Sequence, residues 1–316
     1  MKKYTVFTLC LLLAAACGCE SSTTDTRFLL DTVVTITAEC SDKTLSGAFA
    51  LCEEYDKSLN AHNKESEISK LNQNGGGKVS DETANLLRQS LGFCSMSGGS
   101  FDITVYPLSL IWNFKNEIVP TRNEIAEALS SVDYGSIVID GNNVSLNGTK
   151  IDLGGIAKGY ITDKVLSYLK ENGAAGGIIN LGGNVYVFGE KEYNIGIATP
   201  FKENETAAVL SLKNKSVSTS GVYQRYFKKD GKLYHHIIDP ATGYPAESDL
   251  LSASVICDNS ATADALSTIC ILKGLKGATE FIESLSGVEA IFIDRDYRVT
   301  YTSGIEKNDK VLKLKN

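Results

Sequence analysis

Apolar and polar residues alternate with two different periods along this chain, and the two periods predict a mixture of strands and helices. The β-branched run 31–39 (DTVVTITAE) predicts a strand, and apolar residues at helical spacing in the run 45–59 predict an amphipathic helix. Further helices are expected at 80–96, 121–130, within 151–173, at 260–272 and at 278–285. Further strands are expected at 136–140, 143–146, 178–184, 185–188, 193–198, 207–212, 216–219, 226–229, 233–237, 251–257, 289–294 and 298–301.

Turn and capping residues set the ends of several of these elements. Ser80 has the position of a helix N-cap, and Thr121 and Glu124 have the spacing of a capping box. Four segments lack a clear period. We expect polar turns at 60–72, a loop at 75–77, a Gly-rich turn into a strand stopped by Pro107 at 97–108, and a solvated tail at 306–316.

The order of the elements indicates the fold class. Strands and helices mix without strict alternation, and no repeat of motif length occurs. We therefore predict an α+β fold with a largely antiparallel sheet and packed helices. The length of 316 residues suits one large domain or two ordinary ones.

The N-terminus is typical of a secreted lipoprotein. Two lysines precede an apolar run that is too short to prefer a membrane span, and small residues and a cysteine follow. We predict a signal peptide at 1–16, lipidation of Cys17 with Cys19 as the alternative, and a Ser/Thr-rich tether at 17–27. The protein is then expected outside the cytoplasm, anchored by lipid to the cell membrane.

Composition narrows the remaining function classes. The net charge of −7 argues against a nucleic-acid surface. The cysteines after the tether show no Cys-x-x-Cys spacing, so a zinc site or disulfide framework is disfavoured and buried small side chains are favoured. These residues are Cys40, Cys52, Cys94, Cys257 and Cys270.

The stretch HHIIDPATGYP (235–245) carries the most distinctive chemistry. Adjacent strand residues point to opposite faces, so only one of His235 and His236 can face a given site. Pro240 fixes its own backbone and moves Asp239 out of the helical region. The strand therefore ends in a rigid turn, which suits a catalytic group, although a histidine satisfied in the core is the alternative.

Two further patterns suit phosphate and cation chemistry. Asp264 and Thr268 are four residues apart on one helical face, and their oxygens suit a hard cation such as Mg²⁺; a solvated helix face is the alternative. Gly154 and Gly155 precede a helix, where exposed N–H groups can bind phosphate. A simple tight turn is the alternative, because the spacing matches no nucleotide fingerprint.

Seven stretches together resemble one family, the ApbE-type FAD:protein FMN transferases. The resemblance runs from Phe28 to Tyr301 and implies a single, T-fold-related catalytic domain at 28–316. The stretches, in order, are ESEISKLN, GGSFDITVYPL, IDLGGIAKGYITDK, NLGGNVYVFG, STSGVYQRYF, HHIIDPATGYP and ATADALST.

The resemblance implies a reaction and its partners. FAD is cut at its pyrophosphate, FMN passes to a threonine hydroxyl of an extracytoplasmic acceptor protein, and AMP leaves. Mg²⁺ is expected as the cofactor. Acceptors are expected among subunits of membrane redox complexes or other extracytoplasmic flavoproteins.

The resemblance also implies roles for individual residues. His236 is the expected catalytic base, and His235 is expected to be structural. The expected metal ligands are Asp264, Thr268 and the main-chain carbonyl of Ala157. The expected flavin-nucleotide contacts are Leu30, His62, Phe101 and Asp102 (the last two mainly as scaffold), Lys158, Asp163, Gly182, Gly183, Asn184, Ser220, Gly221 and His236.

Two positions depart from the family pattern. His62 stands where the transferases often carry a tyrosine on the flavin ring, and Val222 stands where an acid or asparagine is common. The first departure leaves hydrolysis of FAD to FMN and AMP as an alternative to transfer. A flavin-binding lipoprotein without turnover is a third hypothesis, and it would produce no AMP from FAD and Mg²⁺.

Overall fold

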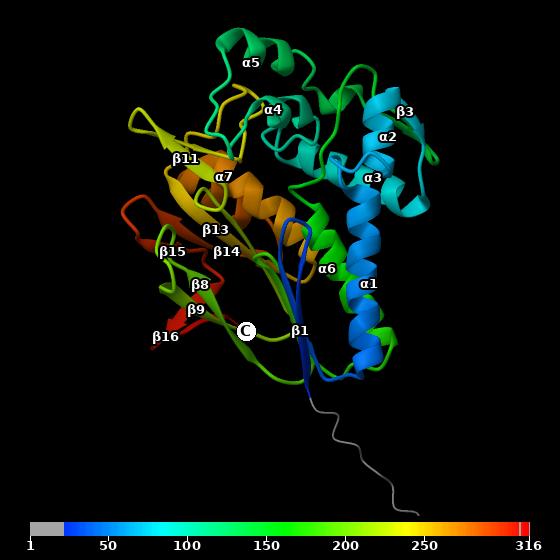
Figure 1. The fold of residues 1–316 in the computed structure, drawn as a ribbon. Coiled ribbons are helices and arrows are strands. Elements are labelled where there is room, and N and C mark those ends of the chain that lie inside the picture. The colour runs from blue at the N-terminus through cyan, green and yellow to red at the C-terminus, as the bar shows by residue number, and fades with distance from the viewer. Residues whose placement is uncertain (1–21, 310, 316) are drawn as a thin grey trace, which may run out of the picture.

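The computed structural model describes residues 22–309 and 311–315, and it has the expected α+β class. An eight-stranded sheet forms its centre, with strand order β1-β2-β6-β7-β10-β13-β14-β15 and antiparallel pairing throughout (Figure 1). The strands are β1 (Thr23–Leu29), β2 (Thr32–Ala38), β6 (Gly177–Leu181), β7 (Asn184–Phe188), β10 (Lys215–Gly221), β13 (Leu250–Cys257), β14 (Glu289–Asp294) and β15 (Val299–Tyr301).

Three long helices cover one face of this sheet. They are α1 (Asp42–Leu59), α6 (Ala157–Glu171) and α7 (Ser260–Glu283), and α7 is interrupted by a kink at Gly274. The apolar side chains of α1 and α6 pack on β2 and β6, and α7 packs along β10 and β13. The predicted helices at 260–272 and 278–285 are the two arms of this kinked helix.

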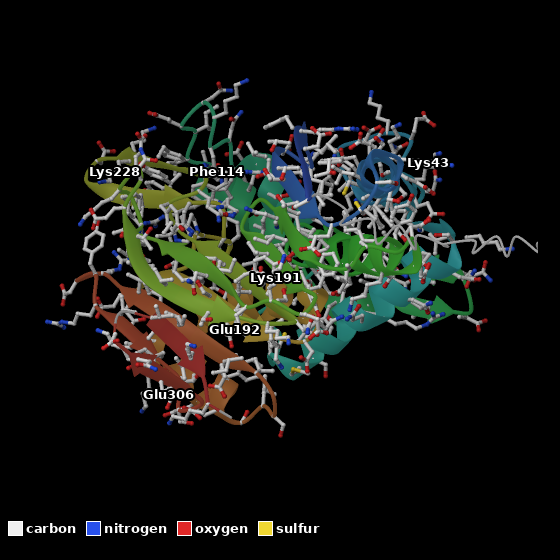
Figure 2. All side chains as sticks on the ribbon, turned by 90° about the horizontal axis from the view of Figure 1, so that it is seen from below. Lys43, Phe114, Lys191, Glu192, Lys228 and Glu306 are labelled. Atoms are coloured by element: carbon white, nitrogen blue, oxygen red, sulfur yellow. The ribbon has the colours of Figure 1, made fainter. Side chains whose placement is uncertain are left out.

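A second, four-stranded sheet covers the opposite face. Its order is β16-β17-β9-β8, and the pair of β17 with β9 is parallel. Apolar side chains from both sheets form the core between them. Lys43, at the start of α1, and Glu306, on β16, lie at opposite sides of the molecule (Figure 2). The strands are β8 (Tyr193–Ala198), β9 (Thr206–Leu212), β16 (Ile305–Asn308) and β17 (Val311–Leu314).

The remaining elements lie in the upper part of the molecule as drawn in Figure 1. Among them, β12 ends at His235, so the histidine pair lies at the end of the β11–β12 hairpin. The capping box predicted at Thr121 and Glu124 is present at the start of α5. The elements are α2 (Glu67–Asn74), β3 (Gly76–Lys78), α3 (Asp81–Met96), α4 (Tyr106–Ile111), α5 (Arg122–Leu129), β4 (Val138–Asp140), β5 (Asn143–Ser145), β11 (Tyr226–Lys229) and β12 (Lys232–His235), with a 3₁₀ turn at Tyr134–Ser136.

The structure corrects four local predictions. Residues 97–108 form turns and the start of α4, because Pro107 occupies its first turn, where its missing N–H costs nothing. The polar segment 60–72 contains the start of α2, and the loop at 75–77 leads into β3. Within the segment predicted as a tail, residues 306–308 belong to β16, with exposed side chains, and residues 311–314 form β17.

The N-terminal boundary also changes. Residues 23–27 were assigned to the tether, but they belong to β1, which pairs with β2 along its whole length. The signal peptide at 1–16, both candidate lipidation sites and tether residues 17–21 lie outside the described residues. Among the described helices, none has the length and apolar character needed to cross a membrane. The five cysteines predicted to be buried are buried.

Candidate active site

A cavity of about 910 Å³ opens between the turn after β1, the wall around α4 and the N-terminal halves of α6 and α7. Its volume is at the upper end of the range for small-molecule and cofactor sites, as a dinucleotide would require. The cavity brings together most of the residues that the sequence assigned to a site. These are Leu30, His62, Phe101, Asp102, Ala157, Lys158, Gly182, Ser220, His236, Asp264 and Thr268.

His236 follows β12 and lies on the cavity wall. Its main-chain N–H donates to the carbonyl of Arg225 at 3.1 Å, and a bridge between Ile238 and Pro245 closes the turn behind it. Burial, with the nearby positive charge of Arg225, lowers the pKa of His236 to about 3. The imidazole is therefore neutral near pH 7 and can accept a proton.

The ring of His236 also has an unused polar atom. Its Nδ1 is buried and has no hydrogen-bond partner among the described residues. Buried polar atoms without partners are rare and call for an explanation such as catalysis. Nδ1 of His235 is likewise buried without a partner among the described residues, so the place on the cavity wall is what distinguishes His236. His235 lies away from the cavity, and its Nε2 is 3.1 Å from the carbonyl oxygen of Ala246. The prediction that only one of the two histidines faces the site is confirmed.

Asp264 is held by both α6 and β10. Its Oδ2 accepts a hydrogen bond from the N–H of Gly159 in the first turn of α6 at 2.9 Å, and its Oδ1 accepts one from Ser218 at 3.2 Å. A carboxylate at a helix N-terminus is stabilised by the helix dipole. The two helices approach so closely there that a Cβ on Gly159 would lie 2.2 Å from the carbonyl oxygen of Ser260.

Asp163 makes the reciprocal contact and does not line the cavity. Its carboxylate accepts hydrogen bonds from the N–H groups of Ser260 and Ala261 and from the side chain of Asn259, at 2.7 to 2.9 Å. Burial raises its pKa. The structure therefore gives Asp163 a structural role at the start of α7, in place of the nucleotide contact that the resemblance implied.

The predicted metal ligands share the cavity. Ala157, Asp264 and Thr268 all line it, and they offer a carbonyl, a carboxylate and a hydroxyl oxygen. Oxygen donors of these kinds fit Mg²⁺, and the residues present are therefore compatible with it. Among the described residues, no group of three or more His, Cys, Asp and Glu side chains could hold a metal, so a site here depends on hydroxyl and main-chain oxygens.

Lys158 supplies a positive charge beside these oxygens. Its Nζ lies 3.7 Å from Oδ1 of Asp264 and 3.4 Å from the carbonyl oxygen of Gly154. The Gly154-Gly155 turn also lines the cavity immediately before α6. An ammonium group beside a helix N-terminus is a suitable environment for a phosphate.

Four other assigned residues line the cavity from the turn after β1 and from the segments around His62 and Phe101. His62 lines it and contacts the ring of Tyr106, with ring centroids 5.6 Å apart. Leu30 also lines it, in a left-handed backbone conformation (φ 55°) that is strained for a branched side chain. Such strain concentrates at functional sites. Phe101 and Asp102 line the cavity as well, and burial raises the pKa of Asp102.

Three further assigned residues are not among those that line the cavity: Gly183, Asn184 and Gly221. Asn184 is fully buried, and its side-chain amide donates to Ser218 at 3.2 Å. Gly182 does line the cavity, and its left-handed backbone (φ 61°) lies so close to Thr32 that a Cβ would be 2.3 Å from the hydroxyl oxygen of Thr32.

Some residues of the cavity were missed by the sequence reasoning. Arg225 and Lys115 bring two more cations to it, and Trp112 is buried and also lines the cavity.

Ser218, which bonds Asp264 but does not line the cavity, was missed as well. The alternating serines of β10 were the available signal, because polar residues at every second position on a buried strand need partners on one facing element.

The chain belongs to the ApbE family, whose family model matches residues 30–292. Two of its similar relatives carry the name FAD:protein FMN transferase. The protein of Treponema pallidum is 32% identical over 295 residues, with 85% of this chain and 82% of the relative covered. The protein of Klebsiella pneumoniae is 31% identical over 268 residues, with coverage of 82% and 84%.

Solved structures agree with this assignment. The ApbE protein of Thermotoga maritima superposes with a TM-score of 0.83 at 30% identity, covering 90% of this chain and 97% of its own. The flavinyl transferase ApbE of Pseudomonas stutzeri gives a TM-score of 0.80 at 26% identity, covering 90% and 95%. The α+β fold expected from the resemblance is confirmed.

Proposed function

We propose that this protein is an FAD:protein FMN transferase. It belongs to a family whose relatives carry that name, and its cavity has the size for FAD. One observation carries the proposal: the neutral imidazole of His236, the ammonium of Lys158 and the oxygens of Asp264 and Thr268 line a single cavity. This set can bind a pyrophosphate and activate a hydroxyl.

The proposed reaction moves a phosphoryl group to a threonine of an acceptor protein. The threonine oxygen attacks the phosphorus on the FMN side of the pyrophosphate, the new P–O bond forms, and the bond to AMP breaks. His236 takes the threonine proton as general base. Lys158 and the N-terminus of α6 bind the phosphate oxygens, because positioning and charge neutralisation dominate such transfers.

Mg²⁺ is the cofactor that these residues would hold. Ala157 through its carbonyl, Asp264 and Thr268 are the proposed ligands, and the bound cation would neutralise charge on the pyrophosphate. Asp264→Ala should lose metal-dependent turnover. An Asp264→Ala protein with unchanged Mg²⁺ dependence would contradict the ligand assignment.

The base assignment is tested with an acceptor protein and in-gel flavin fluorescence. His236→Gly should abolish labelling of the acceptor while FAD still binds, because only the group that takes the proton is removed. FAD binding is measured by quenching of flavin fluorescence. Full labelling by His236→Gly would refute the role of His236.

Hydrolysis of FAD is the second candidate function. The histidine at position 62, in place of the tyrosine common in the transferases, is the observation that favours it. An imidazole stacks on an isoalloxazine ring with less area than a phenol ring does. The two activities separate in one assay: transfer gives fluorescent acceptor and AMP, whereas hydrolysis gives free FMN and AMP. A binder without turnover would release no AMP.

We also propose that the protein acts outside the cytoplasm on a lipid anchor. The N-terminal charge, apolar run and small residues before Cys17 support this location, and the expected acceptors are extracytoplasmic flavoproteins or subunits of membrane redox complexes. Cys17→Ser should release the protein from the membrane fraction. If only Cys19→Ser does so, the lipidated residue is Cys19.

A further inference from the structure

Three serines on one face of β10 match the facing helix α7 residue by residue. Ser216 contacts Ser260 at 2.8 Å, Ser218 contacts Asp264 at 3.2 Å, and Ser220 contacts Thr268 at 3.1 Å. Two residues of strand span about 6.8 Å, and four residues of helix span about 6 Å. The two spacings agree, so each serine meets its own turn of the helix.

The hydrogen bonds around Ser220 run in one direction. Ser267 donates to the main-chain carbonyl of Asp264 at 2.8 Å, because a carbonyl can only accept. The hydroxyl oxygen of Ser267 must then accept a hydrogen bond from Ser220, at 2.7 Å. The single hydroxyl hydrogen of Ser220 is thereby donated to Ser267, and Ser220 can only accept from its other neighbour. Thr268 therefore donates to Ser220. The lone pairs of Thr268 are left for a cation.

The bonds around Ser218 are equally fixed. Oδ1 of Asp264 is a carboxylate oxygen and accepts, so Ser218 donates to it. The oxygen of Ser218 in turn accepts from the side-chain amide of Asn184 at 3.2 Å. With Gly159 held on Oδ2, the carboxylate plane of Asp264 is set from two sides.

We propose that Ser218 and Ser220 are positioning residues that orient the two side-chain ligands of the cation site, Asp264 and Thr268. Ser218, supported by Asn184, sets the carboxylate, and Ser220 sets the hydroxyl of Thr268 so that its lone pairs face the cavity. Partners of metal ligands commonly act in this way. The inference rests on the cation site of the proposed function.

Ser216 provides a matched control on the same strand face. It is as buried as Ser218 and also bonds a side chain of α7, but its partner, Ser260, is no ligand. If the serines only fasten the helix to the sheet, alanine at Ser216 and at Ser218 should have the same effect. If Ser218 positions a ligand, only its substitution should change cation binding.

The experiment measures Mg²⁺ binding to the purified protein by isothermal titration calorimetry, without flavin or turnover. We expect Ser218→Ala and Ser220→Ala to weaken binding about 10- to 100-fold and Ser216→Ala to change it less than about twofold. Thermal unfolding of each variant accompanies the titration. Ser218→Cys, of similar size but a weak donor, should repeat the loss if the alanine variant does not fold.

Equal affinities in Ser216→Ala, Ser218→Ala and Ser220→Ala would overturn the positioning role. The cation site itself is checked separately with Asp264→Ala. If wild type and Asp264→Ala bind Mg²⁺ alike, the metal assignment of the proposed function fails, and the positioning role fails with it. If Asp264→Ala loses binding and the serine variants do not, only the positioning role fails.

Discussion

The fold should be sensitive to acid, because His236 is kept neutral inside the protein. The pKa of His236 sets how much free energy of unfolding is lost as the pH falls. Its pKa falls from the ordinary value of 6.5 to about 3 on folding, chiefly through burial. Below pH 6.5 the unfolded chain gains a proton that the folded protein does not take up. Falling pH therefore stabilises the unfolded state, and the loss continues until pH approaches the folded value.

The size of this loss follows from the two pKa values. Each pH unit between them removes about 1.4 kcal/mol from the free energy of unfolding for one such group. Between pH 6.5 and pH 4.5, His236 should therefore cost about 2 kcal/mol, because the unfolded group is already half protonated at pH 6.5. Burial also lowers the pKa of His235, to about 4, so acid destabilises the fold through this residue as well. The two losses together approach the lower end of the stability of a typical domain, which is about 5–15 kcal/mol.

Urea unfolding of wild type and His236→Gln at pH 7.5, 6.5, 5.5 and 4.5 tests this reasoning. Glutamine does not titrate, so the variant should lose about 2 kcal/mol less than wild type between pH 6.5 and pH 4.5. Near-UV circular dichroism at pH 7.5 verifies that the variant folds. Parallel stability curves for the two proteins would refute the claim that His236 is held neutral by burial.

Other substitutions test neighbouring contacts. Lys158→Met should weaken FAD binding. It should also strengthen Mg²⁺ binding measured without FAD by about 1 kcal/mol, roughly fivefold, because the Lys158 ammonium competes with the cation near Asp264. Calorimetry measures both affinities. Asp163→Ala should lower the free energy of unfolding by about 3 kcal/mol but leave the KM for FAD unchanged, since its carboxylate caps α7. Gly159→Ala should cost about 2–3 kcal/mol in urea unfolding, because a Cβ would lie 2.2 Å from a backbone oxygen of α7, whereas Gly92→Ala, with open space around it, should not destabilise.

Local signals in the sequence predicted local structure well. The capping box of Thr121 and Glu124 and the N-cap of Ser80 mark real helix starts, because each bond joins residues three apart. The same logic failed at Pro107, which was interpreted as the end of a strand. A proline is equally suited to the first turn of a helix, and only the packing of α4 distinguishes the two.

Contacts between segments that are distant along the chain could not be predicted from the sequence. The family resemblance placed Asp163 near the nucleotide, but its partners at the start of α7 are almost 100 residues away in the chain. The strand β17 was interpreted as part of a solvated tail, because nothing in its short run of residues shows that it pairs with β9 and that Leu312 is buried there. His236 and Asp264 were singled out as separate motifs, and their shared cavity followed only from the fold.

The exchange of carboxylates between α6 and α7 limits how flavin can enter and leave. Asp163 ties the start of α7 to α6, and Asp264 ties the start of α6 to α7, so hydrogen bonds cross between the two helices in both directions. These bonds favour a rigid wall around Lys158 and Asp264, so we expect any opening of the cavity to involve the turn at Leu30 and the segment 112–115, which also line it.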